Sequence, residues 1–171
     1  MTTASLHTPE RRAGALVAVA VATVLAVLVA ALAAVAATRA SHRTAVDTAG
    51  ADAVDAASAE VATVLSYDYR HLDDDFKRAE AQLTPRFRPK YIATTAKGVE
   101  PLAAKYKAIS TAAVTSAGLI TASADRVTVL VFVAQTVTNS QLSAPRLDRS
   151  RINVTMVRAG DRWLIDALNP V

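Results

Sequence analysis

The chain of 171 residues contains no cysteine, which excludes a disulfide framework and a thiolate zinc site. Its five glycines form no glycine-rich loop that could cradle a phosphate. The three histidines, His7, His42 and His71, lie far apart and none has the spacing of a metal-ligand pair. We therefore predict that the protein has no cofactor and no metal site.

Concentrated charge is also missing from the sequence. The net charge of +4 is spread along the chain, and no block of five or six like charges occurs. Such blocks are typical of tails that bind nucleic acid. We therefore expect no nucleic-acid partner.

A long apolar run is present from residue 13 to residue 37, and Thr23 is its only polar side chain. A helix of this length extends about 37 Å, more than the roughly 30 Å hydrocarbon core of a bilayer. Because lipid offers no partner for backbone N–H and C=O groups, a spanning segment must be helical. The run predicts a single-pass membrane anchor over residues 13–37.

A cleaved secretory signal is the alternative for this segment, since Arg11-Arg12 precedes the run and Ala34-Val35-Ala36 ends it with small residues. The apolar part of a signal is only about 7–15 residues long, so a retained anchor is favoured. Arg39 and Arg43 balance the two arginines of the other flank, so the charges do not determine the orientation. The predicted division is a tail over residues 1–12, the anchor over 13–37, a connector over 38–43 and a folded domain over 44–171.

Small side chains recur at every fourth position of the predicted anchor. They form a stripe that would let a second membrane helix approach closely. Alanine makes up about half of the segment, so composition is the competing explanation. The stripe contains Gly14, Ala18, Ala22, Ala26, Ala30 and Ala34.

Three helices are predicted after the anchor. The first covers residues 41–65. The second opens at Asp73, where Asp73, Asp74 and Asp75 supply an N-cap and negative charge at the positive end of the helix dipole. The third follows Thr84-Pro85, or begins only at Pro89, because Pro89 obstructs the earlier start, and Gly98 and Pro101 mark its end or a kink. Apolar residues recur every three or four positions in the first two of these helices and form one stripe on each. The stripes contain Val54, Ala57, Val61, Phe76, Ala79 and Leu83.

Strands dominate the second half of the sequence. The β-branched and aromatic run 127–133 predicts a central strand, and we expect further strands over residues 105–121, 151–158 and 162–166. In the last strand Trp163 and Ile165 share one face, which we expect to be buried. Helices followed by a β-meander predict an α+β domain in which N-terminal helices pack on a curved antiparallel sheet.

Two groups of motifs carry a resemblance to a known family. The first is the run from Leu65 to Phe76, followed by Leu83-Thr84, Phe87 and Tyr91. The second comprises residues 145–148, 152–157 and 161–168. In this order behind one apolar segment, they resemble the Mce-associated membrane proteins over nearly the whole chain. The family often has glycine after the Leu-Thr pair, where this chain has Pro85.

The resemblance implies an exported domain with the cone fold of nuclear transport factor two (NTF2) and ketosteroid isomerase. It implies a non-enzymatic accessory role beside Mce complexes, which are lipid importers of mycolate-walled bacteria, with envelope proteins of the importer as partners. It brings no catalytic residues. It also implies that residues 1–12 lie in the cytoplasm and that the chain beyond about Arg39 lies outside the cell membrane.

Residues 67–75 hold the clustered candidates for acid–base catalysis: Tyr67, Asp68, Tyr69, Asp75 and the neighbouring His71. Such chemistry needs a carboxylate and a proton donor in one apolar pocket. A structural interpretation is favoured, with Tyr67 as a core aromatic, Asp68 and Arg70 as surface or interhelix partners, and Asp75 as part of a helix cap. We predict no catalytic residue.

Arg146, Arg149 and Arg151 are crowded where a loop is expected to enter a strand. An exported basic cluster can contact anionic headgroups or an acidic partner surface. Charged side chains at a sheet edge also discourage pairing with a second sheet, which is the alternative explanation.

Two functions therefore compete: an accessory protein that binds other envelope proteins, and a cone that binds a lipid or sterol. The state of the interior distinguishes them, because an open apolar cavity of a few hundred Å³ favours a ligand. Small residues of the first long strand are the candidates to leave such a space: Ala112, Ala113, Ala117 and Gly118.

Overall fold

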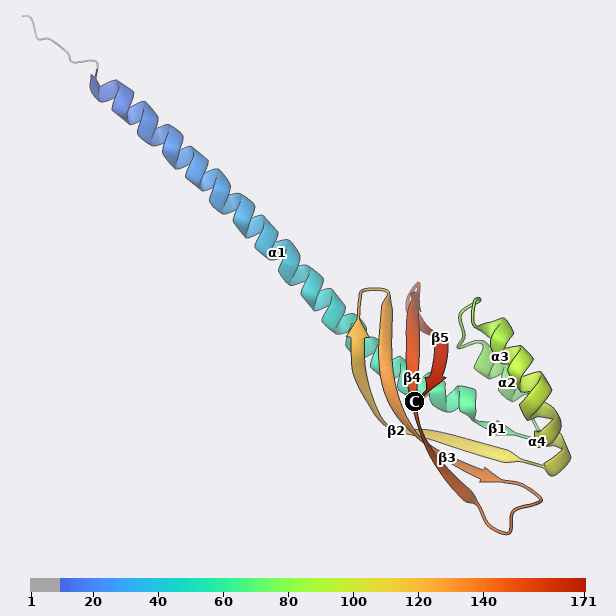
Figure 1. Cartoon of the computed structure of the whole chain (residues 1–171). Coiled ribbons are helices and arrows are strands. Elements are labelled where there is room, and N and C mark those ends of the chain that lie inside the picture. Colours follow the sequence, from blue (N-terminus) through green and yellow to red (C-terminus); the bar gives the residue numbers. More distant parts are fainter. Residues whose placement is uncertain (1–9) are drawn as a thin grey trace, which may run out of the picture. The chain divides into compact units, whose positions relative to one another are not determined.

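The computed structural model describes the backbone of residues 10–171 and the side chains of residue 25 and residues 27–171. The chain divides into two compact units, Met1–Thr44 and Ala45–Val171. The long helix α1, Glu10–Leu65, contributes to both units (Figure 1). Most of the predicted tail over residues 1–12 lies outside the described residues.

The first unit is helical wherever its backbone is described, so the predicted anchor over residues 13–37 lies within α1. Within the described part of the chain, none of the helices combines the length and the apolarity that a membrane crossing requires. The small-residue stripe lies partly outside the described side chains, at Gly14, Ala18, Ala22 and Ala26, whereas Ala30 and Ala34 are exposed.

The second unit contains residues 45–65 of α1, three further α-helices and one sheet. Its elements are β1 (Tyr67–Asp68), α2 (Leu72–Glu80), α3 (Arg88–Thr94), the π-helical turn η1 (Thr95–Val99), α4 (Glu100–Tyr106), β2 (Ile109–Ala122), β3 (Arg126–Thr138), β4 (Arg146–Ala159) and β5 (Arg162–Pro170). The five strands form an antiparallel sheet in the order β1-β2-β3-β4-β5. This confirms the predicted α+β meander, with β3 at its centre (Figure 1).

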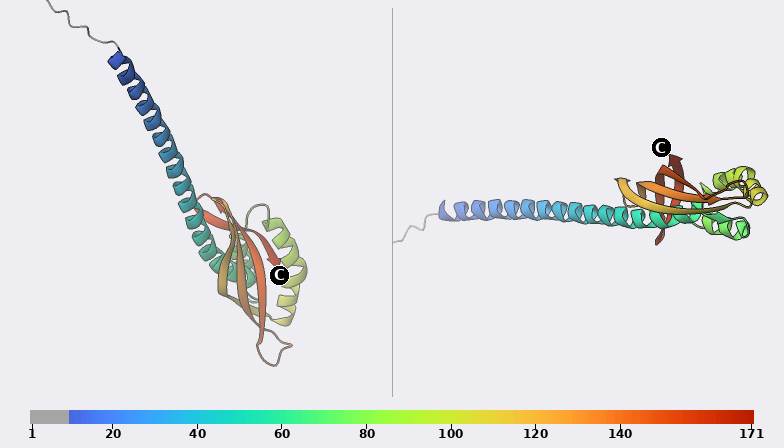
Figure 2. Two further views of the ribbon diagram at one scale, coloured as in Figure 1. Left: turned by 60° about the vertical axis from the view of Figure 1, so that its left-hand side comes forward. Right: turned by 90° about the horizontal axis from the view of Figure 1, so that it is seen from below.

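The C-terminal part of α1 packs on one face of the sheet (Figure 2). Small side chains recur along its buried stripe, which lets the helix approach the strands closely. A Cβ added at Gly50 would lie only 3.1 Å from Leu119 Cδ2 of β2. The buried residues that meet between helix and sheet include Ala49, Ala53, Ala57, Val61, Val127, Val129, Val131, Val154 and Met156.

The last strand confirms the predicted burial of the only tryptophan. Trp163 is 6% exposed and Ile165 is fully buried, and both belong to the hydrophobic core. Leu83 and Thr84, between α2 and α3, run beside β5, because Thr84 N–H donates to the Ile165 carbonyl at 2.9 Å. The helices after β1 are thereby attached to the far edge of the sheet.

Helix starts differ from the sequence prediction at two places. α2 begins at Leu72 with His71 at the N-cap position, so the prediction of Asp73 as N-cap is wrong. Its three aspartates occupy the first turn, where their negative charge interacts favourably with the positive end of the helix dipole, as predicted. Thr84 also starts no helix, whereas the alternative start at Pro89 agrees within one residue with α3, which begins at Arg88. The π-helical turn η1 contains Gly98, where an end or a kink is predicted.

Strand starts differ as well. Residues 105–106 belong to α4, and Lys107 after them has a left-handed backbone with φ 54°, so β2 starts only at Ile109. β4 starts at Arg146, five residues before the predicted strand. Its early half pairs with β3 alone, and this long-range pairing extends the strand beyond its alternating segment.

Candidate functional site

The candidate residues for acid–base catalysis, which we predict not to be catalytic, are divided between two open hollows. Tyr69 and His71 line a polar hollow of about 620 Å³ beside α2. Asp68 and Asp75 line a second hollow of about 480 Å³ between α1, α2 and β2. Neither hollow offers the shared apolar environment that a tuned acid–base pair needs.

The two carboxylates of this cluster are occupied by local contacts. Asp68 forms an ion pair with Arg70, whose hydrogen bonds lower the pKa of Asp68 to about 2. Asp75 is buried, pairs with Arg78 and accepts the Asp68 N–H at 2.7 Å. Asp75 therefore attaches β1 to α2 and does not serve as the predicted helix cap.

The arginine cluster lies within β4 and not at the predicted junction of loop and strand. Arg146 forms an ion pair with Asp148 at 2.8 Å. Arg149 and Arg151 have no carboxylate within 4.0 Å among the described residues. All three arginine side chains are exposed.

The two unpaired arginines share a face of the sheet with an exposed aromatic ring. Arg151 lies opposite Phe132 of β3, and Arg149 lies opposite Ala134. Phe132 is 40% exposed, because its neighbours Val131 and Val133 face the core. We call the surface formed by Phe132, Arg149 and Arg151 the basic face, and it borders a depression of about 480 Å³.

An apolar cavity of about 390 Å³ lies between the end of α1, the helices α2 and α3, and the sheet. Aromatic side chains form much of its wall: Tyr67 lies 6.2 Å from Phe76, and Phe76 lies 6.5 Å from Tyr91, measured between ring centroids. The cavity volume falls within the range of about 300–1,000 Å³ that is usual for ligand sites, so the interior meets the condition that the sequence analysis gave for a bound ligand. Its lining comprises Val64, Leu65, Tyr67, Phe76, Phe87, Lys90, Tyr91, Thr94, Thr95, Val99, Gln135 and Leu168.

Polar groups of this lining are mostly bonded to the protein. Tyr91 Oη donates to the Val64 carbonyl at 3.2 Å, and burial, with a smaller effect of Glu80, raises the pKa of Tyr91 to about 12. Gln135 Nε2 donates to Ser110 Oγ at 2.6 Å. Thr95 Oγ1 donates to the Tyr91 carbonyl at 3.0 Å. These bonds hold the wall in place and leave its surface largely apolar.

The cavity is not formed by the small residues that the sequence suggested. Ala112 and Ala117 of β2 pack against the hydrophobic core, while Ala113 and Gly118 are exposed. None of these four residues lines the apolar cavity. The space lies instead beside α3 and η1, which contribute Lys90, Tyr91, Thr94, Thr95 and Val99 to its lining.

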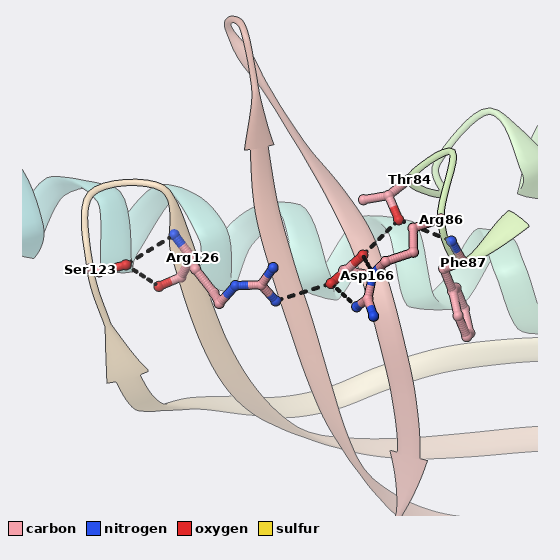
Figure 3. Close-up of polar contacts among 6 residues, drawn as sticks. All are labelled: Thr84, Arg86, Phe87, Ser123, Arg126 and Asp166. Atoms are coloured by element: carbon pink, nitrogen blue, oxygen red, sulfur yellow. Dashed lines mark hydrogen bonds and ion pairs between the residues drawn. The ribbon is translucent and has the colours of Figure 1, made fainter.

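A polar cluster closes the helix layer onto the sheet on the side of β5 (Figure 3). The buried carboxylate of Asp166 accepts hydrogen bonds from Thr84 Oγ1 at 2.8 Å, from Arg86 Nε at 3.0 Å and from Arg126 Nη1 at 3.0 Å. Hydrogen bonds from Arg86, above all, hold the pKa of Asp166 well below its usual range. We call Thr84, Arg86, Arg126 and Asp166 the Asp166 cluster.

The sequence analysis did not identify this cluster, because its members are separated by as many as 82 positions. A buried carboxylate must be paired, so an aspartate inside the apolar strand 162–168 is a usable signal. Thr84 also accepts the Phe87 N–H at 3.2 Å, so the cluster positions one wall of the apolar cavity (Figure 3).

Solved structures with a similar fold come from type IV secretion systems. An IcmL-like protein of Legionella pneumophila aligns with a TM-score of 0.61 at 12% identity, over 71% of this chain and 91% of that chain. CagV of Helicobacter pylori, a VirB8 homolog, aligns with a TM-score of 0.58 at 10% identity, over 71% and 97%. These identities establish the fold alone. The second unit therefore has the α+β fold of the VirB8-like domains.

No family model matches the chain. The outer membrane protein Rv1973 of Mycobacterium tuberculosis is 34% identical over 123 residues, which cover 72% of this chain and 76% of that protein. The protein MT2024.1 of a second strain of the same species gives the same values. The chain belongs to the family of Rv1973 and is a cell-envelope protein.

Proposed function

We propose that the protein is a non-enzymatic, membrane-anchored accessory that stabilises an Mce-type lipid import complex in the cell envelope. Its membership of an envelope family and its VirB8-like domain support this assignment. The observation that carries the proposal is the basic face, on which two unpaired arginines of β4 lie beside an exposed phenylalanine of β3. Aromatic residues and arginine are the side chains that are enriched in protein interfaces.

Partner binding is favoured over pure edge protection at this surface. Edge protection requires charge only, whereas Phe132 adds an apolar ring that would otherwise remain in contact with water. A partner segment with acidic and apolar side chains complements both features. The absence of a shared apolar environment around Asp68 and Asp75 supports a non-enzymatic role.

Recovery of partners from native membranes tests the basic face. The double variant Arg149→Ser with Arg151→Ser should lower recovery of importer subunits on a tagged full-length chain by about tenfold, the loss expected for two interface charges. The double variant Lys97→Ser with Lys105→Ser removes the same charge from exposed helix positions and should leave recovery unchanged. Equal recovery with both variants would exclude the basic face as the contact.

The proposed topology places residues 1–12 in the cytoplasm, the anchor at residues 13–37 and the folded domain outside. Long domains are translocated largely regardless of flanking charge, so the even charge balance permits this orientation. A reporter that is active only outside the cytoplasm, fused after Val171, should be active. Activity of a cytoplasm-only reporter at that position would reverse the assignment.

The anchor contributes to partner binding in this proposal through its small-residue stripe. Ala22→Leu with Ala26→Leu adds bulk where close helix packing needs small side chains, so it should weaken co-purification of envelope proteins. Membrane insertion should be unimpaired, because leucine inserts more favourably than alanine. The matched control is Val21→Leu with Val29→Leu on another face. Unchanged recovery with both pairs would make the anchor a tether only.

A further inference from the structure

We propose that the apolar cavity binds one long acyl chain that ends in a carboxylate, with the chain against the aromatic wall and the carboxylate at Lys90. This site does not depend on the importer or on the basic face. It is an additional binding site within the second unit, because all lining residues lie between Val64 and Leu168.

The interior of the cavity selects an apolar ligand. Most of its donors are already used by protein acceptors: Tyr91 Oη by the Val64 carbonyl, Thr95 Oγ1 by the Tyr91 carbonyl and Gln135 Nε2 by Ser110 Oγ. Thr94 Oγ1 likewise donates to the Lys90 carbonyl at 2.9 Å. A sugar or a nucleotide would give up its hydrogen bonds with water here without gaining enough new ones. A hydrocarbon chain forms no hydrogen bonds with water and therefore gives none up.

The mouth of the cavity selects an anion. Lys90 is the only charged residue of the lining, and its side chain is exposed. No carboxylate of the described residues lies within 4.0 Å of its ammonium group. A lysine beside an apolar cavity keeps its charge in water while its methylene stem borders the apolar wall. A carboxylate on an acyl chain fits this arrangement, whereas a neutral sterol leaves the charge unused.

The wall on the side of α3 is suited to admit a chain. α3 is only seven residues long and contributes no fully buried side chain. The π-helical turn η1 follows it and contributes Thr95 and Val99 to the lining. Single π-helical turns occur frequently at functional sites, since they break the regular helix ladder. This wall can therefore adjust, while the Asp166 cluster holds its other end.

The full-length chain in phosphatidylcholine nanodiscs tests the site with a photoactivatable palmitate that carries a diazirine near its methyl end. Mass spectrometry should place the cross-links on peptides that contain cavity-lining residues. Thr94→Trp fills the mouth from an exposed position and should lower the cross-linking yield by about tenfold. Ala93→Trp, at the neighbouring exposed position outside the lining, should leave the yield unchanged.

The charge at the mouth is tested separately. Lys90→Gln should lower the yield of the palmitate probe by about two- to fivefold, the effect of one exposed ion pair, and leave the matching hexadecanol probe unaffected. Lys97→Gln on the same helical segment should change neither probe. Cross-links confined to residues 13–37, a normal yield with Thr94→Trp, or stronger displacement by cholesterol than by palmitate would each overturn the proposal. Recovery of envelope partners with Thr94→Trp should be normal, which shows that the cavity can be filled without loss of the accessory function.

Discussion

The helix layer meets the sheet in two different ways at its two sides. On the side of β5, the Asp166 cluster brings a buried carboxylate, two guanidinium groups and a hydroxyl into direct hydrogen bonds. On the other side, the aromatic rings of Tyr67, Phe76 and Tyr91 surround a space of about 390 Å³. The two sides are joined by residues 84–87, since Thr84 bonds Asp166 and Phe87 lines the cavity.

This difference indicates a division of roles within one small domain. A polar cluster fixes geometry, because each hydrogen bond demands a defined distance and direction. Apolar walls have no such requirement, so they can remain apart without leaving unsatisfied groups. One fixed side therefore allows the other side to stay open. Mutations that separate the two roles test this view, and we give them from the largest expected effect to the smallest.

Trp163→Ala should cause the largest loss of stability. Trp163 lies three positions before Asp166 in β5 and is almost fully buried in the core, so its removal should lower the free energy of unfolding by about 3–5 kcal/mol. Thermal unfolding of the full-length chain in detergent, followed by circular dichroism, measures this loss. An unchanged cooperative transition would refute the placement of Trp163 in the core.

Asp166→Asn should lower the free energy of unfolding by about 2 kcal/mol near neutral pH, because it weakens several charge-assisted hydrogen bonds. The fold lowers the pKa of Asp166, so the ionised carboxylate stabilises the folded state fully at any pH above the usual carboxyl pKa. This stabilisation is lost as the pH falls from the usual pKa to the lowered one. The difference between wild type and variant should therefore vanish in acid. Asp148→Asn at the exposed pair with Arg146 is the control and should change little.

Glu60 should show the opposite dependence on pH. Burial raises the pKa of Glu60 to about 7, and its Oε2 has no hydrogen-bond partner among the described residues. The buried Glu60 carboxylate destabilises the fold when it is ionised. This destabilisation is absent below the usual carboxyl pKa and grows until the pH passes the raised pKa. Glu60→Gln should therefore stabilise the chain by about 1 kcal/mol near pH 8 and hardly at all near pH 4, after allowance for its partial exposure. Asp52→Asn, exposed on the same helix, should show no such trend.

Phe87→Ala should have the smallest effect, below about 1 kcal/mol, because its ring is only half-buried and borders an open space. Leu83→Ala, four residues earlier at a fully buried position, should cost about 2–5 kcal/mol. Urea titrations of both variants give the comparison. Equal losses would mean that the cavity is closed in solution and that its wall belongs to the core.

Elements with strong local patterns are predictable from the sequence alone. The run 127–133 forms the core of β3, and residues 152–156 alternate between core and outer face as predicted. The acidic first turn of α2 also follows from its three aspartates, although its N-cap does not. Each of these depends on neighbours within a few positions, where side-chain periodicity directly reports burial.

Elements that depend on distant partners are not predictable in this way. β4 begins at Arg146 because residues 126–137 of β3 provide a pairing partner along its whole length. The small residues of β2 fit against the core, so their size does not create the cavity. No local pattern distinguishes a small side chain that leaves a space from one that admits a helix.

The sequence by itself determined the apolar run of residues 13–37, the α+β order of the elements and the burial of Trp163, because hydrophobic periodicity is a local property. Only the tertiary structure decided where Asp166 finds its partners, which two arginines remain unpaired beside Phe132, and where the interior stays open. These features arise from contacts between residues far apart in the sequence, such as Thr84 and Asp166, which are separated by 82 positions. Such contacts form only when the whole domain has folded, since each depends on the packing of several elements at once.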